Sequence, residues 1–208
     1  MTYKAIIWDF GGVITSSPFE AFNYFESQNN LPLDIIRTIN SENPDTNAWA
    51  KFERNDISVN EFDELFKNEA SNKGFDITGK QIIKLLSGEI RPFVVDFLNE
   101  LKGNYKLGCI TNNVQTDKND KKNHSKEVSK VMSLFDNVIE SSLIGIRKPD
   151  PRIYYMSCEA LDVLPESCIY LDDLGINLKP ARAIGMTTIK VTDPNIAVSQ
   201  VKNFLGIV

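Results

Sequence analysis

Short apolar runs of strand length recur along the chain. They cover residues 3–8, 106–110, 137–140, 168–171 and 187–191. The apolar residues in these runs are continuous rather than alternating with polar ones, as in strands that are buried on both faces. This pattern predicts a parallel β-sheet at the centre of the protein.

Helical patterns lie between most of these runs, at residues 91–101, 151–161 and 194–205. The second opens with a proline in its first turn, where proline is well tolerated. The third follows Asp193, a good N-cap residue, and ends before Gly206. Alternating strands and helices are typical of an α/β fold with a doubly wound parallel sheet, whose active site lies at the carboxyl ends of the strands.

One long segment interrupts this alternation directly after the first strand. Its helical patterns cover residues 19–26, 33–39, 48–54 and 60–70, the last preceded by Ser58 as a possible N-cap. No convincing strand pattern occurs there. We therefore expect a core domain of residues 1–17 and 88–208, with a small helical cap domain of residues 18–87 inserted after the first strand.

Composition and charge narrow the class of protein. Hydrophobic residues make up 42% and charged residues 25% of the 208 residues, which is ordinary for a soluble globular enzyme. The net charge is −5 and no basic stretch is flanked by aromatic residues, so nucleic acid is not an expected partner. No apolar run approaches the roughly 18 residues that a membrane helix needs.

Three scattered cysteines and one histidine add further limits. Cys109, Cys158 and Cys168 form no CxxC pair, and the N-terminus has no signal-peptide pattern, so we expect a reducing, cytoplasmic location. A single His124 nearly excludes histidine-based zinc sites and Ser-His-Asp triads. The polar, lysine-rich residues 116–126 are expected to form a solvated loop.

Two predicted strands are followed by residues suited to phosphate chemistry. Asp9 comes after the first strand and before Gly11 and Gly12, so its carboxylate can enter the cleft while the backbone approaches a phosphate closely. Thr111 follows the second strand, where a hydroxyl and a neighbouring backbone N–H can bind a phosphate oxygen. Each signal is weak alone, because such residues also occur in ordinary turns.

A lysine and an aspartate pair add charge to the same edge. Lys148 precedes two prolines and a helix, which can hold its ammonium in place, although a solvated turn lysine has the same pattern. Asp172 and Asp173 follow a buried strand, and their repulsion needs a cation or a lysine to offset it. Oxygen ligands alone favour Mg²⁺. Asp173 could instead be a helix N-cap before Gly175.

The order of these motifs resembles the haloacid-dehalogenase superfamily of phosphotransferases. The resemblance extends over the whole chain, including the helical insertion. Residues 134–155 and 169–191 are most similar to the N-terminal phosphatase domain of soluble epoxide hydrolases and to the related domain fused to some acyl-CoA dehydrogenases. This resemblance implies a Rossmann-like core, a hydrolase activity and a Mg²⁺ cofactor.

The resemblance also implies roles for individual residues. Asp9 would be the nucleophile and also a Mg²⁺ ligand, together with the main-chain carbonyl of Gly11 and the side chain of Asp173. Thr111 and Asn112 would hold the phosphoryl oxygens.

The remaining charged residues would support that centre. Lys148 would neutralise the charge of the phosphoryl group, and Asp172 would order water or pair with Lys148. These groups suffice in principle for phosphoryl transfer through an aspartyl-phosphate.

The chain departs from the usual superfamily pattern at Gly11. Hydrolases of this type usually carry a second aspartate there, which acts as general acid and then as base and is normally worth roughly 10²–10⁴ in rate. The expected function is Mg²⁺-dependent hydrolysis of a small phosphomonoester. One alternative is a catalytically impaired protein that binds a phosphorylated ligand or a partner protein. The other is a metal-free 2-haloacid dehalogenase in which Asp9 attacks carbon.

Substrate selection would lie in the cap. Its aromatic residues are candidates for this role, although apolar residues there are more often core: Phe19, Phe22, Trp49 and Phe52. The sequence indicates neither the physiological substrate nor an oligomeric state.

Overall fold

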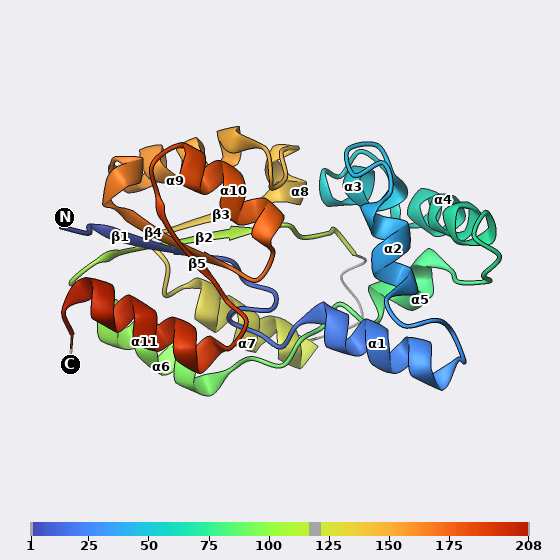
Figure 1. The fold of residues 1–208 in the computed structure, drawn as a ribbon, viewed down its shortest axis with the longest axis horizontal. Helices are drawn as coiled ribbons and strands as arrows, with labels where there is room; N and C mark the ends of the chain where they lie inside the picture. Colours follow the sequence, from blue (N-terminus) through green and yellow to red (C-terminus); the bar gives the residue numbers. More distant parts are fainter. Residues whose placement is uncertain (1, 117–121, 208) are drawn as a thin grey trace.

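The computed structural model describes residues 2–116 and 122–207. At its centre lies a five-stranded parallel sheet in the order β3-β2-β1-β4-β5 (Figure 1). The strands are β1 (Ala5–Trp8), β2 (Lys106–Thr111), β3 (Asn137–Glu140), β4 (Cys168–Asp172) and β5 (Thr187–Lys190). Each lies on one of the predicted apolar runs, and the predicted α/β fold with a doubly wound parallel sheet is confirmed.

The central strand β1 brings the site-forming strand ends together. Every residue of β1 is buried, and Trp8 is paired with Cys109 of β2 on one side and with Leu171 of β4 on the other. From β1 the chain passes to β2 and β3, and then returns to place β4 on the opposite side of β1. The ends of β1, β2 and β4 therefore meet at the point where the strand order reverses, which is the usual ligand position in such sheets.

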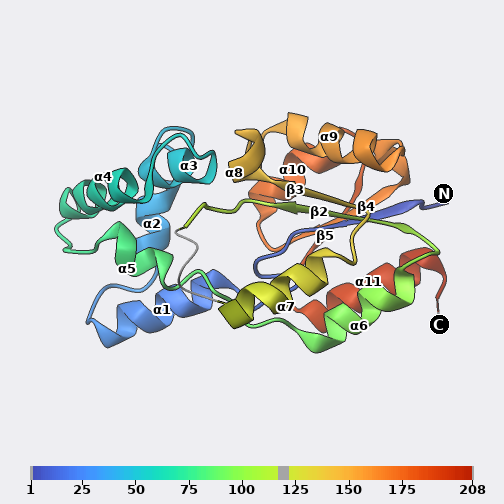
Figure 2. The same ribbon diagram turned by 180° about the vertical axis from the view of Figure 1, so that it is seen from behind.

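Helices cover both faces of the sheet, as both views show (Figures 1 and 2). One face carries α9 (Pro151–Leu161) and α10 (Gly175–Ala183), and the other carries α6 (Pro92–Leu101), α7 (Lys122–Met132) and α11 (Pro194–Leu205). Two separate apolar clusters result, one on each face. The short α8 (Ser141–Ile144) follows β3, and a 3-10 turn, Pro165–Ser167, precedes β4.

Helix α7 corrects part of one sequence prediction. Residues 116–126 were expected to form a loop, but residues 122–126 belong to α7, while residues 117–121 lie outside the described part of the chain. Lysine and glutamate are good helix formers, so a polar segment can extend a helix whose next turns carry the apolar face. Val131 supplies that face and is buried against the sheet.

A second group of helices lies at one end of the sheet (Figure 1). It comprises α1 (Pro18–Gln28), α2 (Ile35–Ser41), α3 (Ala48–Glu53), α4 (Val59–Ser71) and α5 (Gly79–Ile83). These helices form their own apolar cluster. Among the described residues, Val114 is the one member from outside residues 19–86, and it is partly buried. The predicted N-caps at Ser58 and Asp193 are confirmed. No helix in the described residues is long and apolar enough to cross a membrane.

The two chain segments that join this helical group to the sheet run side by side. The amide of Ser16 donates to the Glu89 carbonyl at 2.8 Å, and the amide of Arg91 donates to the Ile14 carbonyl at 2.9 Å. The division into a core of residues 1–17 and 88–208 and a cap of residues 18–87 stays a prediction, to which the separate apolar cluster and the paired linkers lend support.

Candidate active site

A buried lysine lies at the meeting point of the strand ends. Lys148, in the turn before α9, has 1% of its side chain exposed, and its Nζ lies 2.8 Å from Asp9 Oδ1 and 2.8 Å from Asp172 Oδ2. Asp9 directly follows β1, and Asp172 is the last residue of β4. The structure thus brings together three of the residues that the sequence pointed to, from three separate segments.

Asp172 is held by protein groups on both of its carboxylate oxygens. Oδ1 accepts from the amide of Leu174 at 2.8 Å, and Oδ2 accepts from the Tyr170 hydroxyl and from Lys148. The side-chain amide of Asn177 lies 3.1 Å from both oxygens. With its side chain fully buried and both oxygens engaged, Asp172 fixes Lys148 and has little capacity left for a ligand.

Asp9 is bound on one oxygen only. Its Oδ1 accepts from the amide of Phe10 at 2.7 Å and pairs with Lys148, whereas no donor to Oδ2 is found among the described residues. Asp173 is partly exposed beside it, and one carboxylate oxygen from each of Asp9, Asp172 and Asp173 lies within 4.8 Å of the others. Asp9 Oδ2 and the Asp173 carboxylate are therefore the groups that can face a ligand.

Burial and like charge dominate the electrostatics of this cluster. Burial raises the pKa of Asp9 well above its usual range; Lys148 opposes this rise, and Asp172 and Asp173 add to it. Burial, followed by repulsion from Asp172, raises the pKa of Asp173 to about 6. Burial alone would lower the pKa of Lys148, but attraction to Asp172 and Asp9 outweighs it and raises that pKa above its usual range.

The cluster has the charge and the donor atoms for a divalent cation. Among the described residues, three carboxyl groups face one ammonium in a largely buried place, and a divalent cation would offset this excess of acidic groups. All the donors are oxygens, a set that suits Mg²⁺ better than zinc or copper. Gly11, whose carbonyl was predicted to join Asp9 and Asp173, lies in the turn directly after β1.

The two glycines of that turn differ in how tightly they are packed. Gly12 has φ +77°, and a Cβ at this position would lie 2.3 Å from Asp173 Oδ2. The backbone can therefore lie this close to Asp173 only because residue 12 has no side chain. A Cβ on Gly11 would meet only ring atoms of Pro18 at 3.9 Å, an ordinary contact, and Gly11 is not in the left-handed region. The structure therefore has room for a side chain at Gly11 but not at Gly12.

Thr111 and Asn112 lie at the end of β2. Thr111 is its last residue and is 7% exposed. The side chain of Asn112 is already engaged: Nδ2 donates to the Lys148 carbonyl at 3.1 Å and to Glu53 at 3.2 Å, and Oδ1 accepts from the Lys148 amide at 2.8 Å. A contact from Asn112 to a phosphoryl oxygen would thus use its backbone N–H, while its side chain anchors Lys148.

The cap aromatics divide into core and boundary residues. Phe22 and Phe52 are each 1% exposed and belong to the buried part of the cap cluster. Phe19 and Trp49 are only partly buried. Asp173 is not a helix N-cap, because α10 begins at Gly175 without a side-chain cap.

Two residues that bind this network were not among those predicted from the sequence. Asn177 holds Asp172, and Glu53 of α3 reaches Asn112 from the cap. A signal for Glu53 was present: it follows Trp49 by four residues, so it falls on the same helical face as a large apolar side chain.

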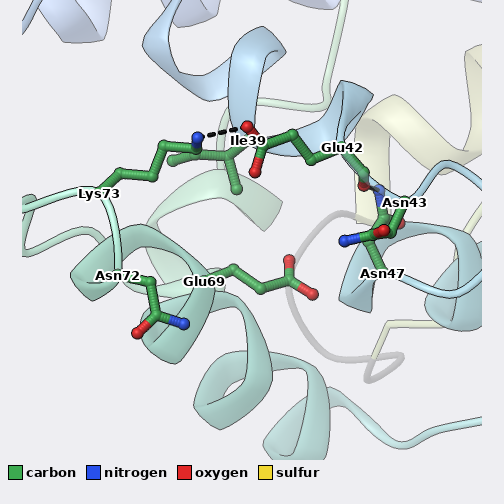
Figure 3. Close-up of a pocket in the computed structure, with 7 residues that line it drawn as sticks. All are labelled: Ile39, Glu42, Asn43, Asn47, Glu69, Asn72 and Lys73. Atoms are coloured by element: carbon green, nitrogen blue, oxygen red, sulfur yellow. Dashed lines mark hydrogen bonds and ion pairs between the residues drawn. The ribbon is translucent and has the colours of Figure 1, made fainter.

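A small hollow of about 180 Å³ lies elsewhere, between α2 and α4 within the cap (Figure 3). The carboxylate of Glu69 points into it, and the ion pair of Glu42 and Lys73 lies at its edge. Glu69 Oε2 is buried and has no hydrogen-bond partner among the residues that the structure describes, and burial raises the pKa of this side chain. None of the lining residues belongs to the strand-end cluster, so the two places are separate.

The structure is a doubly wound α/β sheet with a helical insertion after β1 and charged residues gathered at its strand ends. The sequence pattern of the haloacid dehalogenase-like hydrolases matches residues 3–185, and the chain belongs to this family. The family membership implied by the sequence motifs is confirmed.

Two of the curated relatives belong to the groups that the sequence motifs resembled, the acyl-CoA dehydrogenase family and the epoxide hydrolases. Acyl-CoA dehydrogenase family member 10 of Mus musculus is 31% identical over 220 residues, which cover 99% of this chain and 19% of that protein. Bifunctional epoxide hydrolase 2 of Sus scrofa is 32% identical over 116 residues, covering 56% of this chain and 21% of that protein. This chain therefore spans about a fifth of the length of these two relatives.

One relative has nearly the same length as this chain. Sesquiterpene phosphatase astK of Aspergillus oryzae is 27% identical over 208 residues, covering 99% of this chain and 98% of that protein. Its match therefore includes both the sheet and the helical insertion.

Solved structures share the fold. A family enzyme from Bacteroides thetaiotaomicron, in complex with magnesium and inorganic phosphate, has a TM-score of 0.61 and 22% identity, covering 90% of this chain and 93% of that one. A dehalogenase with an intermediate complex has a TM-score of 0.64 and 16% identity, covering 98% and 97%. Likeness at this level of identity shows the fold alone and does not decide which reaction this chain catalyses.

The packing of the two turn glycines yields a prediction about stability. Gly12→Ala should lower the free energy of unfolding by at least about 1–2 kcal/mol, because alanine is strained at positive φ and its Cβ displaces Asp173. Gly11→Ala is the matched control and should stay within about 0.5 kcal/mol of the wild type. Urea unfolding measures both, and equal losses for the two variants would contradict this account of the turn.

Proposed function

We propose that this chain is a Mg²⁺-dependent phosphatase that hydrolyses a small phosphomonoester through an aspartyl-phosphate on Asp9. The observation that carries the proposal is the cluster in which Lys148 bridges Asp9 and Asp172 while Asp173 lies beside them. Its excess of carboxyl groups over ammonium groups suits a divalent cation. The full-length match to a protein named as a phosphatase supports the same reaction class.

The first half of the reaction forms the phosphoenzyme. Asp9 Oδ2, which has no protein donor among the described residues, attacks phosphorus while the bond from phosphorus to the alcohol oxygen breaks. Lys148 offsets the charge of the transferring group, and the Thr111 hydroxyl and the Asn112 N–H hold its oxygens. In the second half, water attacks phosphorus, which releases inorganic phosphate and restores the Asp9 carboxylate.

Mg²⁺ would be held by Asp9, the Gly11 carbonyl and Asp173. When bound, it supplies positive charge at the phosphoryl oxygens. Asp172 is assigned to Lys148 because the protein already occupies both of its oxygens.

The same cluster weighs against the two alternatives. A metal-free dehalogenase has no need to gather Asp172 and Asp173 beside Asp9, since their repulsion raises the pKa of the attacking group. A binding protein without turnover has no need for an aspartate oxygen left free for attack. Gly11 bears on the rate of proton transfer but does not remove the nucleophile, because the proposed metal contact is through the backbone.

Metal dependence tests the proposal. A panel of phosphomonoesters, assayed with Mg²⁺, should contain substrates that release inorganic phosphate, and EDTA should abolish the release until Mg²⁺ is restored. Activity that EDTA leaves unchanged would contradict the metal site. Metal-independent release of halide from a 2-haloacid would favour the dehalogenase instead, and no turnover on any substrate would favour the binding protein.

The open space at Gly11 yields a second prediction. Without a general acid, aryl phosphates such as p-nitrophenyl phosphate should be turned over better than alkyl phosphates, whose leaving groups need a proton. Gly11→Asp should raise kcat on alkyl phosphates by up to about 10²-fold, because a positioned carboxyl can donate that proton. Aryl phosphates should gain less.

Gly11→Ala is the control for the prediction at Gly11, since it adds the Cβ without the carboxyl and should leave both rates near the wild-type values. A folded Gly11→Asp enzyme with unchanged rates on alkyl and aryl phosphates would show that another group already transfers the proton.

A further inference from the structure

A buried glutamate of the cap contacts the core at several points. Glu53, the last residue of α3, is 6% exposed. Its Oε2 lies 2.6 Å from Arg147 Nε and 3.2 Å from Asn112 Nδ2, and its Oε1 accepts from Trp49 Nε1 at 2.8 Å. Its backbone carbonyl accepts from the Ser141 hydroxyl at 2.7 Å. One cap residue thus binds three residues that follow, or lie beyond, β2 and β3.

Two of these core partners hold the backbone of Lys148. The Asn112 side chain accepts from the Lys148 amide and donates to the Lys148 carbonyl, so it binds the backbone of Lys148 through two hydrogen bonds. Arg147 directly precedes Lys148 and also donates to the carbonyl of Pro44, in the loop before α3. Glu53 therefore acts on the segment from which Lys148 reaches Asp9.

The charge of Glu53 is needed for these contacts. Burial raises the pKa of Glu53, and the nearby Arg147 opposes that rise. Oε2 of Glu53 faces both Arg147 and Asn112, while Oε1 accepts from Trp49. A neutral amide at this position has one oxygen, so its NH2 group faces either the Trp49 N–H or both Arg147 and Asn112, and in either orientation it removes the charge that offsets Arg147. Removing one partner of a buried ion pair leaves the other charge without compensation.

Both side-chain oxygens of Glu53 are engaged by the protein, so its effect on a substrate is indirect. We propose that Glu53 is a positioning residue: through Asn112 and Arg147 it fixes the Lys148 segment, so that the ammonium is held between Asp9 and Asp172 while α3 is docked on the core. The kinetic part of this inference rests on the proposed phosphatase function. Docking of the cap then becomes a condition for a complete active site.

A second buried glutamate of the cap provides a matched control. Glu26 is fully buried, and it accepts from the amides of Asp34 and Ile36, both within the cap. A variant at Glu26 weakens the cap without touching the core. The two positions separate a loss of cap stability from a loss of Lys148 placement.

The experiment compares Glu53→Gln with Glu26→Gln in the full chain. Hydrogen–deuterium exchange without substrate should speed up at residues 112–115 and 141–148 in Glu53→Gln only. With p-nitrophenyl phosphate and Mg²⁺, kcat of Glu53→Gln should fall by about 10²-fold with a smaller change in KM, because small displacements of a catalytic group act mainly on the transition state. Glu26→Gln should lower Tm but keep kcat within about twofold.

A double variant, Glu53→Met/Arg147→Met, covers the case in which Glu53→Gln does not fold. It replaces the buried pair by apolar side chains, which often preserves stability, but it removes the Glu53 acceptor of Asn112 and leaves that amide with the Lys148 carbonyl alone. Its Tm should recover while the fast exchange and the low kcat remain. The proposal would be overturned if the Glu53 variants showed the same exchange rates and the same kcat as Glu26→Gln. It would also be overturned if neither Glu53 variant folded.

The two readouts separate this inference from the proposed function. Faster exchange at residues 112–115 and 141–148, in a protein whose wild type hydrolyses no phosphomonoester, would support the positioning role and reject the phosphatase.

Discussion

The ion pairs of the buried Lys148 ammonium are the contacts on which the rest of the site depends. Its Nζ lies 2.8 Å from both Asp9 and Asp172, with 1% of the side chain exposed. Burying an ammonium without a charged partner strongly destabilises the folded protein. The two carboxylates are therefore needed for Lys148 to be buried at this position. Asp172 in turn is fixed by Tyr170 and Asn177, which leaves Asp9 as the member of this group with a free oxygen. The network ties β1, β4 and the turn before α9 to a single point.

Different forces hold the helical insertion together and join it to the sheet. Inside the cap an apolar cluster dominates, and it takes in little from the core beyond Val114. The junction instead uses polar groups around Glu53, which bind Asn112, Arg147 and Ser141. When a polar contact is broken, water replaces the lost hydrogen bond, so the net loss of free energy is smaller than for an apolar contact. A junction of this kind can therefore open while each part stays folded. Under the proposed function, this junction would let the helical insertion admit a substrate and complete the site when it docks.

Much of this arrangement could be predicted from the sequence, because parallel strands share an edge. Asp9, Thr111 and Asp172 each end or follow an apolar run, and strand pairing alone then brings them together. The pairing of Glu53 with Arg147 could not be predicted, since it depends on how two distant segments dock. For Asn112 the sequence indicated a place at the strand end but not that Lys148 and Glu53 would occupy its side chain. The start of α7 was missed because a lysine-rich segment suits a loop as well as a helix.

The most direct measurement of the central claim follows phosphorus and oxygen through one turnover. The enzyme is mixed with Mg²⁺ and a phosphomonoester in oxygen-18 water, quenched in acid and digested for mass spectrometry. The account predicts a phosphoryl group on the peptide that contains Asp9, its absence from Asp9→Asn, and oxygen-18 in the released phosphate but not in the Asp9 carboxylate. Phosphate release without a phosphorylated Asp9 peptide, or oxygen-18 incorporated into Asp9, would contradict it.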